Sequence, residues 1–270
     1  MTASGFRPRR LTPAALARWP LPKPGGDADK EDRGHVLIVA GSVEMPGAAL
    51  LAAVAALRAG AGKLTIAAPA GIAQGLAFAV PEARVVGLPQ ARSGALLARG
   101  GDSLAAVAGN VRALVVGPGM QHERSIVGLV RALMPLFCDA TVVLDALAMS
   151  VVRHGALAQP VVMTPHAGEM AYISGQSKEA VCEDPVAAAR EAASRWNACV
   201  ALKGSSTVIA SPDGATWQFD DGAAGLATSG SGDTPSGVRG RRSRRDMTRP
   251  SSQVERSPRA RNSLPGHGSN

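Results

Sequence analysis

Residues 35–62 read HVLIVAGSVEMPGAALLAAVAALRAGAG, and this stretch predicts the architecture of the domain. Residues 36–40 form a continuous apolar run without polar alternation, as expected of a strand buried on both faces. A glycine turn follows, and Pro46 opens an alanine- and leucine-rich run that reaches Arg58 and stops at a Gly-Ala-Gly turn. Proline at the first helical position and glycine after the last are typical of a helix. The stretch therefore predicts a β-α unit.

The same pattern recurs along the chain. Short runs rich in valine, leucine or alanine, each bounded by turn residues, predict further strands at residues 63–68, 113–117, 141–144, 161–164 and 200–203. The intervening segments predict helices at residues 123–137, 167–174 and 185–196. Residues 207–210 and 216–219 flank a Pro-Asp-Gly turn and indicate a hairpin. We therefore expect an α/β fold with a doubly wound, mostly parallel sheet, flanking helices and an antiparallel edge hairpin.

Composition excludes several classes of protein. Of the 270 residues, 46% are hydrophobic and 3% aromatic, so aliphatic side chains must fill the core and a wholly disordered chain is excluded. No apolar run approaches the roughly 20 residues that a membrane span needs, and no secretory signal is expected. The three cysteines, Cys138, Cys182 and Cys199, do not have metal-site spacing, which favours a reducing, cytoplasmic environment.

The distribution of charge predicts three regions. Residues 1–34, rich in proline, glycine and charge, predict an extended N-terminal arm, and residues 35–238 predict the α/β domain. Residues 239–270 hold nine arginines, two acids and no apolar periodicity, so we expect a disordered tail. Because this tail carries most of the formal net charge of +8, nucleic-acid binding is expected only as non-specific contacts of the tail.

Small and polar residues gather where the predicted strands end, and open α/β sheets bind ligands at that edge. Residues 41–49 and the Gly-Pro-Gly loop at 117–119 could each be a tight turn or a ligand-facing loop. In the segment Thr-Pro-His-Ala-Gly-Glu, His166 and Glu169 stand at a predicted helix start, where free N–H groups favour acids. The alternative there is a surface histidine beside an acid that only complements the helix dipole.

Two later segments offer groups suited to phosphate. Residues 203–207, Lys-Gly-Ser-Ser-Thr, provide a cation and three hydroxyls, with a plain β-turn as the alternative. The most informative segment is Gly230-Ser231-Gly232-Asp233, because glycines and hydroxyls before a helix present backbone N–H groups to an anion. A carboxylate in such a cradle is costly without a task, so Asp233 is predicted as a general base for a hydroxyl that attacks a phosphoryl group.

Together these segments resemble the ADP-dependent NAD(P)H-hydrate dehydratases, carbohydrate-kinase-like relatives with the ribokinase fold. The family's order is kept from about residue 35 to residue 237: Ala-Gly-Ser with Pro-Gly-Ala-Ala and Leu-Arg-Ala-Gly-Ala-Gly, then Gly-Pro-Gly, Leu-Asp-Ala, Thr-Pro-His-x-Gly-Glu, Leu-Lys-Gly-x-x-Thr and Gly-Ser-Gly-Asp. Thr-Pro-His-x-Gly-Glu combined with Ala-Ala-Leu-Arg is specific to this branch, whereas Gly-x-Gly-Asp marks the superfamily.

The resemblance implies which residues bind each nucleotide. The hydrated nicotinamide nucleotide is expected to lie against five residues: Ala48, Ala49, Gly119, His166 and Asp233. The co-substrate ADP is expected to be held by two segments: Lys203, Gly204, Ser205, Ser206 and Thr207, and then Gly230, Ser231 and Gly232. A cytoplasmic homo-oligomer is expected.

The implied reaction repairs the S-epimer of NADH or NADPH hydrate. ADP phosphorylates the hydroxyl that water has added to the dihydronicotinamide ring, AMP is released, and phosphate then leaves to restore the double bond. Asp233 would take the hydroxyl proton, and the backbone N–H groups of its loop would stabilise the transferring phosphoryl charge. Mg²⁺ is expected to bridge the phosphates. Asp145 is the candidate for placing this ion, although Leu147 stands where the family usually has a second acid.

The C-terminal region departs from the family's pattern. In the family, Gly-Asp begins a long apolar helix followed by further helices that close the nucleotide site, whereas here residues 235–238 run directly into Arg239-Gly240-Arg241-Arg242. Such an abrupt change of composition is what a shifted reading frame would produce. Without that helix, the anion cradle lacks its dipole and the sheet lacks a cover. We therefore expect the family fold with impaired stability and low or absent activity.

Three alternatives to the dehydratase remain. A vitamin or sugar kinase of the ribokinase superfamily would use Gly-Ser-Gly-Asp equally well, although residues 164–169 argue against it. A non-catalytic remnant would bind nucleotide without turning it over. A nucleic-acid-binding protein would use the arginines of the tail, which lack interleaved aromatic residues.

Overall fold

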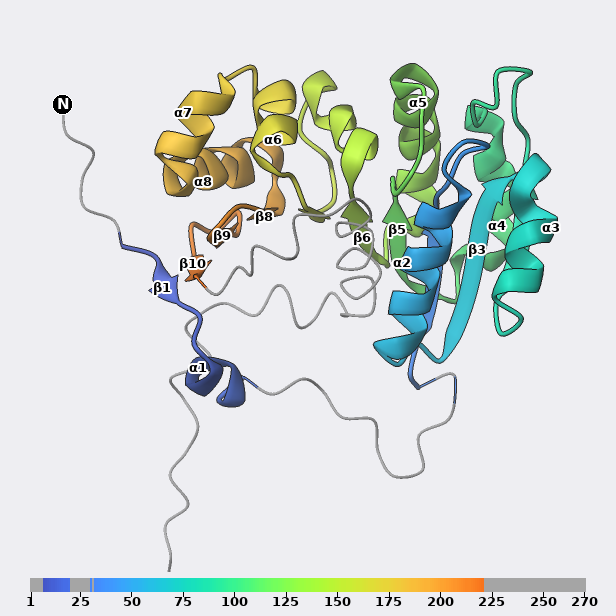
Figure 1. Cartoon of the computed structure of the whole chain (residues 1–270), viewed down its shortest axis with the longest axis horizontal. Helices are drawn as coiled ribbons and strands as arrows, with labels where there is room; N and C mark the ends of the chain where they lie inside the picture. The colour runs from blue at the N-terminus through green and yellow to red at the C-terminus, as the bar shows by residue number, and fades with distance from the viewer. Residues whose placement is uncertain (1–6, 20–29, 31, 221–270) are drawn as a thin grey trace, which may run out of the picture.

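The computed structural model describes residues 7–19, 30 and 32–220, and the statements below concern these residues. Ten strands form one sheet in the order β1-β10-β9-β8-β7-β6-β5-β2-β3-β4 (Figure 1). The strands are β1 (Arg9–Arg10), β2 (His35–Val39), β3 (Lys63–Pro69), β4 (Arg84–Leu88), β5 (Val111–Val116), β6 (Thr141–Leu144), β7 (Val161–Met163), β8 (Ala198–Leu202), β9 (Thr207–Ala210) and β10 (Thr216–Phe219).

The pairing of the strands confirms the predicted fold class. All neighbours from β8 to β4 run parallel, whereas β9 is antiparallel to both β8 and β10. The central strands are buried along almost their whole length, as β2, β3 and β6 illustrate. This burial explains why their sequences lack polar alternation.

Helices connect the parallel strands, and those predicted from sequence are found in place. The α-helices are α1 (Pro13–Ala17), α2 (Pro46–Arg58), α3 (Ala70–Ala79), α4 (Ala105–Ala108), α5 (Glu123–Leu133), α6 (Ala167–Ser174), α7 (Lys178–Glu183) and α8 (Pro185–Trp196). Three 3₁₀ segments complete the set: η1 (Ala98–Leu104), η2 (Met134–Phe137) and η3 (Ala146–His154). The predicted helix at residues 123–137 is thus an α-helix whose last turn tightens to 3₁₀, which is common at helix ends.

Side chains of the buried strands alternate between two cores, one on each face of the sheet. Leu37 and Val39 of β2 belong to the larger core, which includes residues of α4, α5, η3, α6, α7 and α8. Val36 and Ile38 belong to a smaller core with α2 and α3. Within residues 32–220, α2 and α3 are the helices that cover this second face, and they pack over β2, β3 and β4.

The N-terminal segment differs from the extended arm predicted over residues 1–34. Its described part forms β1, which pairs in parallel with β10, and then α1. Helix α1 is specified by its cap, because the Thr12 hydroxyl accepts a hydrogen bond from the Ala15 backbone N–H at 3.1 Å. The Trp19 ring lies 6.1 Å from the ring of Trp217 in β10. Strands β9 and β10 form the predicted antiparallel hairpin, but β1 lies outside β10 and is the edge strand of the described sheet.

Residues 70–110 form elements for which no prediction was made. Helix α3 has no charged residue and buries only Leu76, so its sequence lacks the polar and apolar faces that identify a helix. Strand β4 lies at the sheet edge and is half-exposed over most of its length. Among the helices of the described residues, none is long and apolar enough to span a membrane.

Candidate active site

The carboxyl ends of the parallel strands meet at one edge of the sheet, and polar residues follow several of them. Gly117 follows β5, Asp145 follows β6, Thr164 follows β7 and Lys203 follows β8. Because these strands are neighbours in the order β8-β7-β6-β5, the sheet brings together loops that lie far apart in sequence. This edge is where open α/β sheets bind their ligands.

Asp145, Thr164 and Lys203 form a buried polar cluster at this edge. The Thr164 hydroxyl donates a hydrogen bond to Oδ1 of Asp145, and the Lys203 Nζ lies 3.6 Å from the same oxygen. The Asp145 side chain is 5% exposed and the Lys203 side chain 26%. A buried carboxylate needs such partners, because an unpaired charge away from water is strongly disfavoured. Lys203, predicted to contact the nucleotide, thus also neutralises Asp145.

His166 caps the N-terminus of α6. Its Nδ1 accepts hydrogen bonds from the backbone N–H groups of Gly168 and Glu169, at 3.0 and 3.2 Å. The Glu169 carboxylate reciprocates by accepting from the His166 backbone N–H at 2.8 Å, which completes a capping box. The other ring nitrogen, Nε2, lies 3.6 Å from Oε2 of Glu169, and the His166 side chain is 60% exposed. The pair therefore caps α6, and contact of the His166 ring with substrate stays a prediction.

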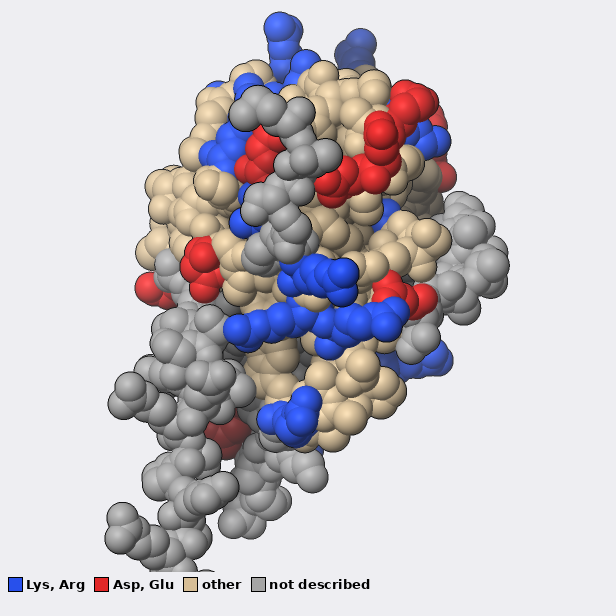
Figure 2. Space-filling view, turned by 90° about the vertical axis from the view of Figure 1, so that its left-hand side faces the viewer, with Lys and Arg blue, Asp and Glu red and all other residues tan. Residues whose placement is uncertain are grey.

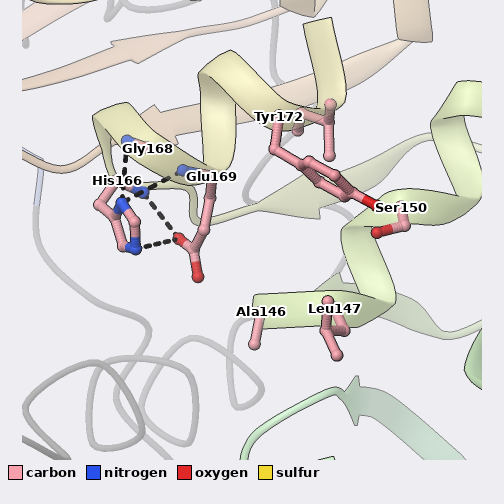
Figure 3. A pocket seen from close by; sticks show the side chains of 8 residues that line it. Ala146, Leu147, Ser150, His166, Gly168, Glu169 and Tyr172 are labelled. Atoms are coloured by element: carbon pink, nitrogen blue, oxygen red, sulfur yellow. Dashed lines mark hydrogen bonds and ion pairs between the residues drawn. The ribbon is translucent and has the colours of Figure 1, made fainter. Parts of the chain in front are cut away.

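A pocket of about 350 Å³ lies between η3 and the first turns of α6 (Figure 3). On one side it is lined by Ala146, Leu147 and Ser150, and on the other by His166, Glu169 and Tyr172. The η3 residues follow directly from Asp145, so the pocket adjoins the buried polar cluster. Of the residues predicted to bind the substrate, His166 is the one that lines this pocket.

Tyr172 forms one wall of the pocket, and two residues that do not line the pocket, Glu123 and Arg153, hold its side chain in place. Its hydroxyl donates a hydrogen bond to a Glu123 carboxylate oxygen and accepts one from Arg153 at 2.9 Å. The Arg153 guanidinium also lies over the ring, 4.7 Å from its centre. The hydrogen bond to Glu123, followed by desolvation, raises the pKa of Tyr172. These contacts fix the orientation of a ring that is 49% exposed.

The predicted substrate residues Ala48, Ala49 and Gly119 lie together at the start of α2. A Cβ on Gly119 would stand 2.5 Å from the Cβ of Ala48 and 2.9 Å from the Met45 carbonyl oxygen, so only glycine fits there. Gly119 also has φ +66°, the left-handed region that glycine favours. The side chains of Ala48 and Ala49 are 9% and 0% exposed. Close backbone packing of α2 against the Gly-Pro-Gly loop is thus their structural role, and their contact with substrate stays a prediction.

The loop Lys203–Thr207 turns from β8 into β9 and is tied to the N-terminal segment. The Ser206 hydroxyl donates to Oδ1 of Asp220 at 3.0 Å. Arg10 of β1 donates to Oδ2 of Asp220 from Nη2 and Nε, at 2.6 and 3.1 Å. The Arg10 guanidinium, then Ser206 and Gln218, lower the pKa of Asp220. Figure 2 looks onto this side of the molecule, where basic side chains gather across the face; both arginines of β1 are exposed.

The described residues offer few ligands for the magnesium ion that the family resemblance implies. No group of three or more histidine, cysteine, aspartate or glutamate side chains in the described part of the chain could hold a metal ion. Leu147, which stands where the family usually has a second acid, lines the pocket between η3 and α6. Oδ2 of Asp145 accepts no hydrogen bond from the described residues, and Mg²⁺ commonly takes one or two carboxylates together with substrate phosphates. The residues therefore fit an ion that arrives with a nucleotide.

The predicted site residues Gly230, Ser231, Gly232 and Asp233 lie outside the described residues, as does the tail at 239–270. Three residues of the site were missed by sequence reasoning: Ser150, Tyr172 and Asp220. Ser150 and Tyr172 belong to no glycine-rich or charged motif, so the sequence carried no signal for them, whereas Asp220 begins the run Asp-Asp-Gly at residues 220–222. Their involvement depends on 3₁₀ geometry in η3 and on contacts between distant segments.

Comparison with known proteins places these observations in a family. A family model described as NAD(P)H-hydrate dehydratase matches residues 36–240. An ADP-dependent (S)-NAD(P)H-hydrate dehydratase from Xanthomonas campestris pv. campestris is 48% identical over 236 residues, which cover 87% of this chain and 80% of that protein.

Solved structures give the same result. The ADP/ATP-dependent NAD(P)H-hydrate dehydratase from Bacillus subtilis, co-crystallized with ATP/Mg²⁺, matches with a TM-score of 0.75 and 31% identity over 86% of this chain and 80% of that one. A ribokinase-like superfamily protein from Enterococcus faecalis V583 also has a TM-score of 0.75, with 22% identity over 89% and 82% of the two chains. The second likeness concerns the fold alone.

Proposed function

Because the chain belongs to the NAD(P)H-hydrate dehydratase family, we propose that it is a lyase that dehydrates the S-epimer of NADH or NADPH hydrate at the expense of ADP. The observation that carries this proposal is the meeting of Lys203, Asp145 and Thr164 beside the His166 cap at one sheet edge. The Lys203 cation suits a phosphate-bearing substrate, and the Asp145 carboxylate suits a metal ion bound to that phosphate.

The described residues have defined tasks in this reaction. Lys203 and the hydroxyls of Ser205 and Thr207 attract the phosphates of ADP, whereas the Ser206 hydroxyl donates to Asp220. Asp233 accepts the proton of the substrate hydroxyl as that oxygen attacks the terminal phosphorus of ADP and AMP departs. The phosphate ester formed then loses phosphate, and the ring's double bond is restored. When bound, Mg²⁺ neutralises phosphate charge, and Asp145 is the residue that would hold it with the nucleotide.

The alternative of a vitamin or sugar kinase has less support. A relative that is 48% identical over most of both chains carries the dehydratase name, and the segment at residues 164–169 agrees with that branch.

The direct test is an assay of the full chain with (S)-NADH hydrate, ADP and magnesium. We expect slow recovery of the dihydronicotinamide absorbance, in keeping with the low activity expected from the C-terminal region, with AMP and phosphate formed in equal amounts. Asp233→Asn should abolish both the absorbance recovery and the formation of AMP and phosphate. Asp213→Asn is the control, since this carboxylate caps the distant β9–β10 turn. Transfer of phosphate from ATP to a thiazole, pyrimidine or sugar alcohol would favour the kinase instead. Nucleotide binding without turnover would identify a remnant.

The remaining proposals concern the ends of the chain and its surroundings. We propose that residues 35–238 form the dehydratase domain, that residues 239–270 are an appended tail, and that the protein is a cytoplasmic homo-oligomer. A chain ending at residue 238 would then keep whatever activity the full chain has. Sequencing the gene across the codons of residues 236–242 tests the reading-frame shift, and a one-base correction that restores an apolar helix would establish it.

A further inference from the structure

The N-terminal strand β1 is linked to the loop Lys203–Thr207 through one carboxylate, that of Asp220. Its Oδ2 accepts hydrogen bonds from Nε and Nη2 of Arg10, at 3.1 and 2.6 Å. Its Oδ1 accepts from the Ser206 hydroxyl at 3.0 Å and from the Gln218 side-chain amide at 2.8 Å. Figure 1 shows β1 beside β10 at the end of the sheet, so the carboxylate joins the beginning of the described chain to a loop far along the sequence.

Stability alone does not account for this pair. The Arg10 side chain is 77% exposed and the Asp220 side chain 34%. Water and salt screen such a pair, and the entropy lost in ordering a long arginine side chain opposes the attraction. Strand β1 has only two residues, and both are exposed. What the contacts do define is the position of a carboxylate beside the loop that is proposed to hold ADP.

The loop is fixed at both ends by backbone contacts and in between by a side chain. At its start, the Lys203 backbone N–H donates to the Pro165 carbonyl oxygen at 2.7 Å. At its end, β9 pairs with β10. Between these points the Ser206 hydroxyl is held by Asp220. The position of Ser206 in the loop therefore depends on where the Asp220 carboxylate is held.

A carboxylate at this place needs a compensating charge. ADP would bring its phosphates to Lys203 and the neighbouring hydroxyls, and an uncompensated negative charge next to Ser206 would repel them. The Arg10 guanidinium, 2.6 Å away, supplies the opposite charge. The same guanidinium, followed by Ser206 and Gln218, lowers the pKa of Asp220. The carboxylate is therefore ionised near neutral pH and accepts from Ser206, while the pair as a whole is neutral.

We propose that Arg10 and Asp220 are positioning residues for the nucleotide loop: Asp220 holds Ser206, and Arg10 orients Asp220 and compensates its charge. Neither residue touches the nucleotide. The inference rests on the proposed function for the place of ADP. It adds the N-terminal strand β1 to the parts of the chain that determine the affinity for ADP.

The test is calorimetric titration of the full chain with ADP and magnesium, and separately with NADH. We expect Arg10→Gln to raise the Kd for ADP about 3- to 5-fold, the upper range for one exposed charge pair, and to leave the Kd for NADH nearly unchanged. Arg9→Gln is the matched control, because it removes the same charge from the other residue of β1. It should leave both Kd values nearly unchanged. Arg10→Lys keeps the charge and should recover most of the affinity for ADP.

A double variant distinguishes action through Asp220 from direct contact with phosphate. Combining Arg10→Gln with Asp220→Asn removes both charges and leaves an amide oxygen that can still accept from Ser206. We expect this variant to bind ADP within about 2-fold of the unsubstituted chain, because the two losses are coupled. A double variant as weak as Arg10→Gln alone would mean that Arg10 binds the phosphates itself, and would overturn the proposal.

A second comparison tests the link from Asp220 to the loop. Ser206→Ala and Gln218→Ala each remove one donor to the same oxygen of Asp220, but only Ser206 belongs to the loop. We expect Ser206→Ala to raise the Kd for ADP about 2- to 3-fold, the low end for a hydrogen bond. Gln218→Ala should have no such effect. Equal effects of the two variants would contradict the positioning of the loop through Ser206.

The remaining outcomes separate this inference from the proposed function. Equal losses of affinity for ADP and NADH in Arg10→Gln, or an equal loss in Arg9→Gln, would reduce the pair to a structural or general charge effect and overturn the inference. Turnover with a Kd for ADP that ignores Arg10 would leave the function and remove the inference. Binding of ADP that depends on Arg10 without turnover would do the reverse. If the unsubstituted chain did not bind ADP, both would fail.

Discussion

Replacing Lys203 by methionine (Lys203→Met) would leave the carboxylate of Asp145 buried beside a single neutral donor, Thr164. Two unit charges 3.6 Å apart attract each other by about 4–5 kcal/mol at an effective dielectric constant of about 20. The desolvation that Lys203 no longer undergoes offsets part of this, because its side chain is only 26% exposed. We expect the free energy of unfolding to fall by about 2–3 kcal/mol. For a domain of this size that corresponds to a melting temperature roughly 4–12 °C lower.

Urea unfolding followed by circular dichroism at neutral pH measures this loss. Lys178→Met, at the exposed start of α7, is the control and should change stability by less than about 0.5 kcal/mol. Adding Asp145→Asn to Lys203→Met should recover at least half of the loss, because the stranded charge is then gone. A loss below about 0.5 kcal/mol for Lys203→Met, or a double variant no more stable than the single one, would show that the two groups are not coupled.

Three further perturbations address other contacts. Gly119→Ala should cost about 2 kcal/mol or more in chemical unfolding, because its Cβ would overlap α2 and its φ is positive; Gly109→Ala, with open space around it, should not. Glu123→Gln should lower the pKa of Tyr172 towards 10.0, which ultraviolet titration resolves cleanly because the chain has one tyrosine. Arg10→Gln should raise the pKa of Asp220, which carboxyl NMR titration measures. The pair stabilises the folded chain near neutral pH, and this contribution is lost as the pH falls through the folded pKa of Asp220, so the variant should show a smaller contribution.

Sequence predicted the elements whose ends carry chemical signals. Helix α6 begins where His166 and Glu169 form the capping box, and α8 begins where Asp184 accepts from the Ala187 backbone N–H, followed by Pro185. Helix α2 carries the same proline signal. Helix α3 has neither a charged residue nor a cap, and Pro69, the residue before it, makes no side-chain hydrogen bond. Capping residues and prolines therefore predict where a helix begins. They give no prediction for a helix such as α3, which is stabilised by packing alone.

The site was predictable in its motifs and unpredictable in its contacts. Strand ends placed Lys203, Asp145 and His166 at one sheet edge, which the strand order then brought together. Lys203 follows β8 and Asp145 follows β6, with β7 between them. The distance between the two side chains therefore depends on how these three strands are aligned, and the sequence does not show that alignment. Ser150 was missed because it lies in a 3₁₀ segment, whose three-residue repeat differs from the helical periodicity used to find buried faces.

The parallel pairing of β1 with β10 has a consequence for the order in which the chain is assembled. The two strands lie about 200 residues apart in sequence, so β1, the earliest strand of the described residues, waits for β10 before it can pair. Until then β1 has no partner in the sheet, and unpaired strand edges promote aggregation. The two-residue strand β1 and the contact between Trp19 and Trp217 thus complete this edge of the sheet late in synthesis. Because this pairing needs β10, the N-terminal segment joins the sheet only after the other eight strands of the described sheet have been made.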